Sequence, residues 1–303
     1  MNSPESHPKL SVVVVCYEMA AQIENTLRSL LPPYQREIGI DDYEIILIDN
    51  GSAQMLPEQL RTSSPNLHYI YLPPHEAKPS PAEAINRAAA AARAPLLCLM
   101  IDGARMVTPG VLSWALVLLG LAPHSIVEVR GWHLGPKWQP ASVMTGYNEA
   151  EERKLLESIR WPENGYRLWE IAAATPQTCL GYSAVTSESN CLFMASDLFA
   201  TIGGFDERTR FAGGGWVNLD FFSRAVRAAD RVFTLLGEGT FHQVHGGAAT
   251  SLTTPELREA SKRWRAESQD LGQAISSDYP YILAGHLPPE CAAWLAQHAR
   301  SAS

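Results

Sequence analysis

The chain has 303 residues, a hydrophobic content of 46% and a formal net charge of −8. This length and polarity are typical of a globular protein with one large domain or two modest ones. The acidic balance excludes a general nucleic-acid binder, because such proteins need a basic face to displace phosphate counterions. The five cysteines show no C-x-x-C spacing, and several lie in apolar runs, which favours a reducing, cytoplasmic compartment.

The first third of the chain alternates strand and helix patterns. Apolar or β-branched runs predict strands at 10–16, 43–49 and 67–72. Helical spacing or helix-start signals predict helices at 20–31 and at 80–93. Such alternation predicts a mainly parallel sheet flanked by helices.

The rest of the chain is less regular. The apolar run at 111–122 is shorter than the roughly 20 residues that cross a bilayer, so we expect a core helix there. The alternative is a peripheral contact of this run, or of the carboxyl-terminal segment, with the inner membrane face. Residues 123–185 are expected to form an excursion that binds an acceptor. A strand is predicted at 191–195, and helices are predicted at 148–159, 196–202, 218–229 and 254–275.

One acidic residue and two histidines predict a metal site. Asp102 ends an apolar run and enters a glycine-containing turn, at the edge where open α/β sheets bind ligands. His242 and His245 can add neutral imidazoles, so we expect Mg²⁺ or Mn²⁺ beside a diphosphate. Because residues three apart in a strand point to opposite faces, one histidine is expected to bind, and His245 is favoured. A turn-capping aspartate and hydrogen-bonded loop histidines are the structural alternatives.

The order of several short motifs resembles the family 2 glycosyltransferases of the GT-A fold. The resemblance spans residues 10 to 250 and rests on Ile48-Asp-Asn-Gly-Ser52, Ile85-Asn86, Leu99-Met-Ile-Asp102, Ile202-Gly-Gly-Phe-Asp-Glu207, and Gly213-Gly-Gly215 ahead of Asp220 and Arg224. It implies a Rossmann-like α/β fold with one GT-A domain over 1–250. Within it, 1–105 would be the nucleotide-binding half and 106–250 a smaller, irregular acceptor-binding half. Residues 251–303 are expected to be a helical extension.

The resemblance also implies an activity. Members of the family transfer a sugar from a nucleotide diphosphate, usually with inversion, and we expect a UDP-sugar donor. The expected acceptor is a hydroxyl of a saccharide or glycolipid, as in polysaccharide or glycoconjugate biosynthesis. The residues expected at the nucleotide are Cys16, Tyr17, Glu18, Asp49, Asn86 and Asp102.

Two positions depart from the family pattern. The D-x-D motif reads Asp102-Gly-Ala104, so its second acid is missing, and the histidines can compensate. Where the family usually has Glu-Asp after the glycines, this chain has Val217-Asn218. The later acid, Asp220, is therefore the expected catalytic base.

Several roles keep an alternative. Asp220 could be only an anion at a helix start, and Glu188 is the second candidate base. Asp49 could cap its strand instead of binding the nucleotide base. The residues expected at the acceptor are Trp216, Asn190 and Gly214.

Two other functional classes are alternatives. A nucleotidyltransferase would normally show a glycine-rich, basic phosphate loop near its amino terminus, and residues 15–22 contain none. The missing acid at Ala104, together with Asn218, would suit an inactive module that binds a sugar or nucleotide. The sugar, the acceptor and the oligomeric state stay open.

Overall fold

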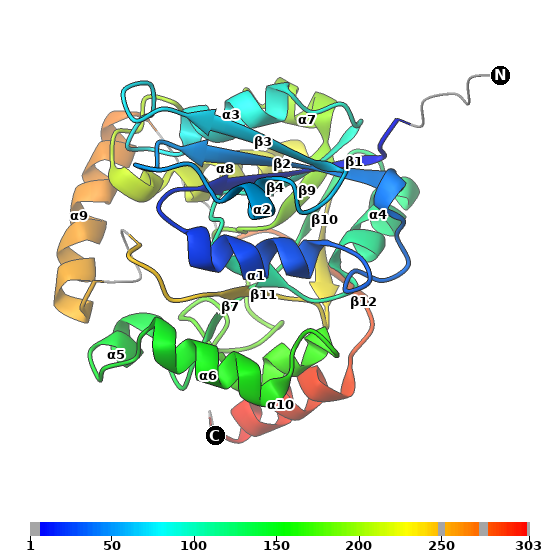
Figure 1. Cartoon of the computed structure of the whole chain (residues 1–303), viewed down its shortest axis with the longest axis vertical. Helices are drawn as coiled ribbons and strands as arrows, with labels where there is room; N and C mark the ends of the chain where they lie inside the picture. The colour runs from blue at the N-terminus through cyan, green and yellow to red at the C-terminus, as the bar shows by residue number, and fades with distance from the viewer. Residues whose placement is uncertain (1–6, 248–251, 273–277, 302–303) are drawn as a thin grey trace.

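Two sheets organise the molecule in this computed structural model, which describes residues 7–247, 252–272 and 278–301 (Figure 1). The large sheet has the strand order β12-β10-β6-β9-β4-β1-β2-β3. All neighbouring strands in it run parallel except β9, which is antiparallel to both β4 and β6. The prediction of a mainly parallel sheet is therefore confirmed. The strands of this sheet are β1 (Leu10–Cys16), β2 (Tyr43–Asn50), β3 (Leu67–Leu72), β4 (Leu96–Met100), β6 (Ser125–Glu128), β9 (Leu192–Ala195), β10 (Arg231–Leu236) and β12 (Ile282–Gly285).

Helices cover both faces of the large sheet (Figure 1). In β1, Val12 and Val14 pack in the same cluster as α1 and α4, whereas Val13 and Val15 pack with α3, α7 and α8. This alternation follows from the two-residue period of a strand and explains why β1 is apolar at nearly every position. The helices around this sheet are α1 (Ala20–Leu30), α2 (Glu58–Arg61), α3 (Ala82–Ala90), α4 (Val111–Leu121), α7 (Ser196–Thr201) and α8 (Val217–Ala228).

A second, small sheet was not predicted from the sequence. Its strand order is β5-β11-β7-β8, and its apolar side packs against a cluster rich in tryptophan. Trp132 and Trp169 meet there edge to face, with ring centroids 4.4 Å apart. The strands and the nearby helical segments are β5 (Arg105–Val107), β7 (Gly131–Leu134), β8 (Ala172–Ala173), β11 (Thr240–His242), α5 (Gln139–Val143), α6 (Glu149–Ile159) and η2 (Gly165–Ile171).

The segment after residue 251 is more than a helical extension. It contains α9 (Thr254–Asp270) and α10 (Pro289–Ser301), but β12 between them joins the large sheet beside β10. The end of the predicted helix, residues 273–275, lies outside the described residues. The remaining short helical turns are η1 (Ile40–Asp42) and η3 (Ala212–Gly214).

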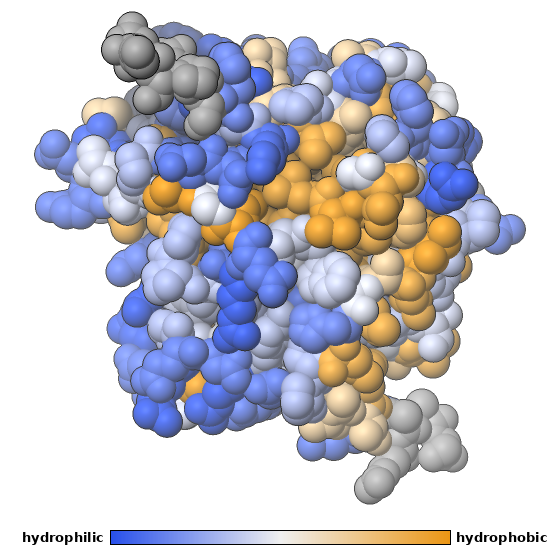
Figure 2. All heavy atoms as spheres, turned by 90° about the vertical axis from the view of Figure 1, so that its right-hand side faces the viewer, coloured by the Kyte–Doolittle hydropathy of each residue, from blue (hydrophilic) through white to orange (hydrophobic). Residues whose placement is uncertain are grey.

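The predicted core helix at 111–122 is α4, which buries one side against the large sheet. Its other side exposes Val117 and Leu121, and β12 exposes Ile282 and Leu283 nearby on the same side of the molecule. Apolar side chains gather on this face (Figure 2). Within the described ranges, no helix combines the length and the apolar character that a membrane span requires.

At Gly103, the turn after β4 packs tightly against the end of β1. A Cβ atom at this position would lie 2.7 Å from the carbonyl oxygen of Val15 and 2.9 Å from Cδ1 of Ile23. The Gly103 carbonyl also accepts a hydrogen bond from Thr26 Oγ1 at 2.7 Å. Glycine at this position therefore brings Asp102 close to the end of β1.

We expect Gly103→Ala to lower the free energy of unfolding by about 1–3 kcal/mol, because the added methyl overpacks a backbone contact. The control is Gly120→Ala in α4, where a Cβ would have no atom within 4 Å. That change should be neutral or raise stability by up to about 1 kcal/mol through helix propensity. Urea unfolding curves measure both, and a Gly103→Ala protein as stable as wild type would contradict the packing argument.

Candidate active site

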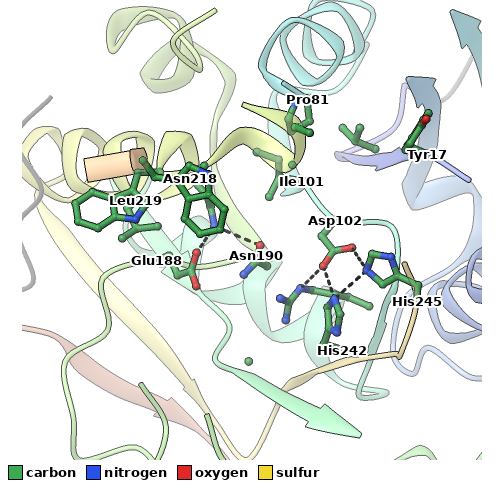
Figure 3. A pocket seen from close by; sticks show the side chains of 18 of the residues that line it. Tyr17, Pro81, Ile101, Asp102, Glu188, Asn190, Asn218, Leu219, His242 and His245 are labelled. Atoms are coloured by element: carbon green, nitrogen blue, oxygen red, sulfur yellow. Dashed lines mark hydrogen bonds and ion pairs between the residues drawn. The ribbon is translucent and has the colours of Figure 1, made fainter. Parts of the chain in front are cut away.

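A cavity of about 950 Å³ opens where the strands of the large sheet end and the small sheet begins. Its walls come from the ends of β1, β2 and β4, from the small sheet, from the glycine loop around η3, and from α9. Figure 3 shows that Asp102, His242 and His245 form one side of this cavity, and that Glu188, Asn190 and Asn218 lie together on another. Ligands are expected at such an edge of an α/β sheet.

The three residues of the predicted metal site come together. Asp102 Oδ2 lies 3.0 Å from His242 Nε2, and Asp102 Oδ1 lies 3.9 Å from His245 Nε2. The two Nε2 atoms are 3.2 Å apart. The expectation that strand geometry keeps one histidine away is wrong, because β11 ends at His242 and His245 lies beyond the strand.

The hydrogen bonds of His242 fix which of its nitrogens carries the proton. Gln139 donates from Nε2 to the His242 carbonyl, at 2.9 Å, so its Oε1 faces His242 Nδ1 at 2.6 Å. Nδ1 therefore donates, and Nε2 presents its lone pair to the Asp102 carboxylate. Burial lowers the pKa of His242 to about 4, so the ring is neutral at physiological pH.

Asp102 is ionised. Burial alone would raise its pKa, but the charge of His242 when that ring is protonated, together with the guanidinium of Arg105, outweighs burial and holds the pKa well below its usual range. A carboxylate oxygen and two imidazole nitrogens lie within 4.8 Å of one another in this cluster. This donor set has the chemistry of a divalent-ion site, because Mn²⁺ and Mg²⁺ accept carboxylate oxygen and Mn²⁺ accepts imidazole more readily.

The chain between the histidines is clamped from two helices. The Val244 N–H donates to both carboxylate oxygens of Glu152 on α6, at 3.0 and 2.9 Å. The Val244 carbonyl accepts from Gln22 Nε2 on α1 at 2.9 Å. The Tyr147 hydroxyl donates to Glu152 Oε2 at 3.1 Å. These contacts position His242 and His245 without touching either ring.

The second group of polar residues centres on Glu188. Asn218 Nδ2 donates to Glu188 Oε2 at 3.1 Å and also lies 3.3 Å from Asn190 Oδ1. Gln177 Nε2 donates to Glu188 Oε1 at 3.2 Å. All four residues line the cavity. Two side-chain amides therefore orient a carboxylate whose oxygens face the cavity.

Asp220, the predicted base, does not line the cavity. Its buried carboxylate accepts from Arg224 Nε at 2.9 Å and pairs with Arg224 Nη2 at 2.7 Å. Arg224 in turn donates to the Ile202 carbonyl at 2.6 Å. The i,i+4 ion pair turns Asp220 along its own helix, so of the two candidate bases only Glu188 lines the cavity.

The predicted nucleotide residues divide into two groups. Cys16, Tyr17 and Asp102 line the cavity, together with Asn50 and Gly51, which were not predicted there. The other three predicted residues, Glu18, Asp49 and Asn86, lie outside the cavity lining and hold loops in place. Glu18 accepts a hydrogen bond from the Ala53 N–H, and Asp49 accepts from the Ser52 N–H and the Tyr69 hydroxyl. Asn86 forms hydrogen bonds with both the N–H and the carbonyl of Phe205. For Asp49, the strand-end cap is the geometry that the structure has.

Three tryptophans border the cavity. Trp216, predicted at the acceptor, is joined by Trp138 and by Trp264 of α9. Gly214 is buried, and a Cβ atom added at this position would lie 2.6 Å from Val217 Cγ1. Its neighbours Gly213 and Gly215 line the cavity, whereas Gly214 does not. The sequence did not distinguish Trp138 from tryptophans of the core. Trp132, Trp161 and Trp169 are such core residues and are buried.

Comparison with known proteins agrees with this geometry. Residues 11–104 match the model of glycosyl transferase family 2. The chain is 30% identical over 147 residues to validoxylamine A glucosyltransferase of Streptomyces hygroscopicus subsp. jinggangensis. The matched region covers 48% of this chain and 30% of that protein. The chain thus spans less than a third of the length of that curated relative.

Solved structures share the fold. TarS 1–349 of S. aureus in complex with UDP-GlcNAc superposes with a TM-score of 0.54 and 16% identity, over 89% of this chain and 68% of that one. GalNAc-T7 with UDP, GalNAc and Mn²⁺ gives a TM-score of 0.52 and 14% identity, over 97% and 55%.

The chain therefore shares the GT-A fold of these solved structures. The match of residues 11–104 to the glycosyl transferase family 2 model confirms the family resemblance over this part of the sequence.

Glu152 gives the site a measurable pH signature. Burial raises its pKa from 4.5 to about 8, although hydrogen bonds from Val244 and Tyr147 act in the opposite direction. Between these two values the folded chain binds more protons than the unfolded chain. The contribution of Glu152 to stability therefore falls as pH rises through this window, by at most about 1.4 kcal/mol per pH unit.

We expect Glu152→Gln to flatten the dependence of unfolding free energy on pH between about pH 5 and pH 8, because the amide does not titrate. Glu151→Gln, one residue away and exposed, should keep the wild-type slope. Urea unfolding at several pH values measures the slopes. Equal slopes for wild type and Glu152→Gln would contradict the raised pKa.

Proposed function

We propose that this chain transfers a sugar from a nucleoside diphosphate sugar, with UDP as the expected nucleotide, to a hydroxyl of a saccharide or glycolipid. The observation that carries the proposal is one cavity with two polar groups on separate sides, the Asp102–His242–His245 cluster and the amide-held Glu188 (Figure 3). TarS with UDP-GlcNAc and GalNAc-T7 with UDP share the fold and support a UDP donor.

The proposed reaction is a direct displacement. Glu188 accepts the proton of the acceptor hydroxyl as its oxygen bonds to the anomeric carbon, and the bond from that carbon to the diphosphate breaks. Attack opposite the leaving group inverts the anomeric centre. Asn218 and Gln177 hold Glu188 through its two oxygens during the proton transfer.

Asp102, His242 and His245 would hold a divalent ion, Mn²⁺ or Mg²⁺. When bound, such an ion supplies positive charge for the leaving diphosphate as a Lewis acid. The Gln139 contact keeps His242 in the tautomer that metal binding needs. GalNAc-T7 with Mn²⁺ supports manganese as the first ion to test.

The half-buried tryptophans Trp138, Trp216 and Trp264 would pack against the acceptor, with Asn190 beside Glu188 supplying a polar contact. Large aromatic rings with a polar edge suit saccharide surfaces, which carry both apolar faces and hydroxyls. We place the reaction in polysaccharide or glycoconjugate biosynthesis in the cytoplasm. The exposed apolar side of α4 would serve a peripheral contact with the inner membrane face.

We expect UDP to bind more tightly with Mn²⁺ than in EDTA, and Asp102→Ala to remove most of that difference, by about tenfold or more in Kd, because the ion loses its only carboxylate in the cluster. Isothermal titration calorimetry measures both. Asp41→Ala is the control, because this exposed acid lies just before β2, at the opposite end of that strand from Asn50 in the cavity lining. Identical UDP affinity with and without metal in the wild-type chain would refute the metal proposal.

We expect Glu188→Gln to lower kcat for UDP release from UDP-glucose or UDP-N-acetylglucosamine by about 10²–10⁴, with UDP affinity little changed. Asp220→Asn is the matched control and should keep turnover in its folded fraction, because its carboxylate is committed to Arg224. The opposite pattern would return the base to Asp220. Binding of UDP without turnover of either donor, with or without a saccharide panel, would favour an inactive binding module.

A further inference from the structure

We propose that Arg105 binds the diphosphate of the donor, supplying a permanent positive charge on the leaving-group side of the cavity. This inference rests on the proposed function and assigns a new role to a residue that lines the cavity. It concerns donor binding by the protein itself and does not need a metal ion.

The small sheet aligns Arg105 with the histidines. Arg105 on β5 lies directly across from His242 on β11, and His242 lies directly across from His133 on β7. Side chains that are directly opposite on neighbouring strands lie on the same face of a sheet. All three line the cavity, so this face forms a row of nitrogen-bearing side chains beside Asp102.

Arg105 is buried, and its Nε atom has no hydrogen-bond partner. Only 8% of the residue is exposed. Nε lies 3.3 Å from Asp102 Oδ2, which gives an ion pair. In the described part of the chain, Nε is the guanidinium nitrogen of Arg105 that is buried without a hydrogen-bond partner. A buried donor without an acceptor is costly, and an anion in the cavity would supply an acceptor.

Arg130 shows what a purely structural buried arginine has in this protein. Its guanidinium donates to the Gly181 carbonyl at 3.1 Å, pairs with Glu128 at 3.5 Å and lies over the Tyr281 ring at 5.0 Å. Its Nε, like that of Arg105, has no hydrogen-bond partner, but Nη1 and Nη2 both have protein partners, and the residue does not line the cavity. Arg105 differs because it lines the cavity.

The surroundings of Arg105 leave room and charge for a phosphate. A Cβ at Gly131 would lie 3.1 Å from Nη1, so glycine keeps that side of the guanidinium open. The protein therefore presents one carboxylate, one arginine and neutral imidazoles to a diphosphate. A planar guanidinium can hold two phosphate oxygens at once.

The competing explanation is that Arg105 only orients Asp102. The two explanations differ in EDTA, where Asp102 has no ion to hold. If Arg105 contacts the β-phosphate, the wild-type chain without metal should bind UDP about tenfold or more tightly than UMP, since a charge-assisted hydrogen bond to phosphate contributes about that ratio. This comparison needs no variant.

Arg105→Gln in the full chain should then weaken UDP binding in EDTA to within about twofold of UMP, while UMP affinity itself changes little. Arg105→Lys keeps the charge without the planar fork and should give an intermediate ratio. Arg36→Gln, exposed and outside the cavity, is the control. Isothermal titration calorimetry measures the affinities, and circular dichroism verifies that each variant is folded.

An unchanged UDP-to-UMP ratio in Arg105→Gln, or equal affinities for the two nucleotides in wild type, would overturn this inference and leave the proposed function standing. Failure of the wild-type chain to bind any nucleoside diphosphate even with Mn²⁺ would instead overturn the proposed function, and the inference with it.

Discussion

The contact between Asp102 and His242 connects the two sheets of the molecule. Asp102 follows the last residues of β4 in the large sheet, whereas His242 ends β11 in the small one, and their side chains are 3.0 Å apart. Only Gly103 and Ala104 separate Asp102 from β5, so the chain passes from one sheet to the other within the site. The position of Arg105, the fit of Gly103 under β1 and the clamp on Val244 all serve this junction.

Much of the stability of the site must come from groups that never touch a substrate. Gln139 fixes the tautomer of His242, and Gln22 and Glu152 hold the backbone between the two histidines. Gln243 donates hydrogen bonds from its side-chain amide to the Gln22 carbonyl and to Thr26 Oγ1. In a buried, low-dielectric environment such bonds are strong, and an unpaired member would be costly. This network pre-organises the nitrogen and oxygen atoms of the cluster before any ligand arrives.

The sequence revealed β1, β2 and β3 of the large sheet because these strands are six to eight residues long and mostly apolar. It did not reveal the small sheet, since strands of two to four residues carry too few positions for a two-residue period. Asp102 was predictable because it ends an apolar run. The pairing of Asp220 with Arg224 instead of a substrate was not, because the first turn of a helix does not define which way a side chain faces. The role proposed for Arg105 follows from its pairing with His242 on the neighbouring strand, and sequence spacing does not show this pairing.

The antiparallel direction of β9 determines which insertions in the chain would move the residues of the cavity. In a parallel sheet, only loops that follow strands reach the carboxyl edge. Because β9 runs against β4, with Leu192 beside Leu99 and Ala195 beside Leu96, the loop that precedes β9 reaches that edge instead. Residues inserted after β9 would fall at the opposite rim of the protein, while a change of one residue before it would shift Glu188. The chain can therefore lengthen after β9 without moving Glu188.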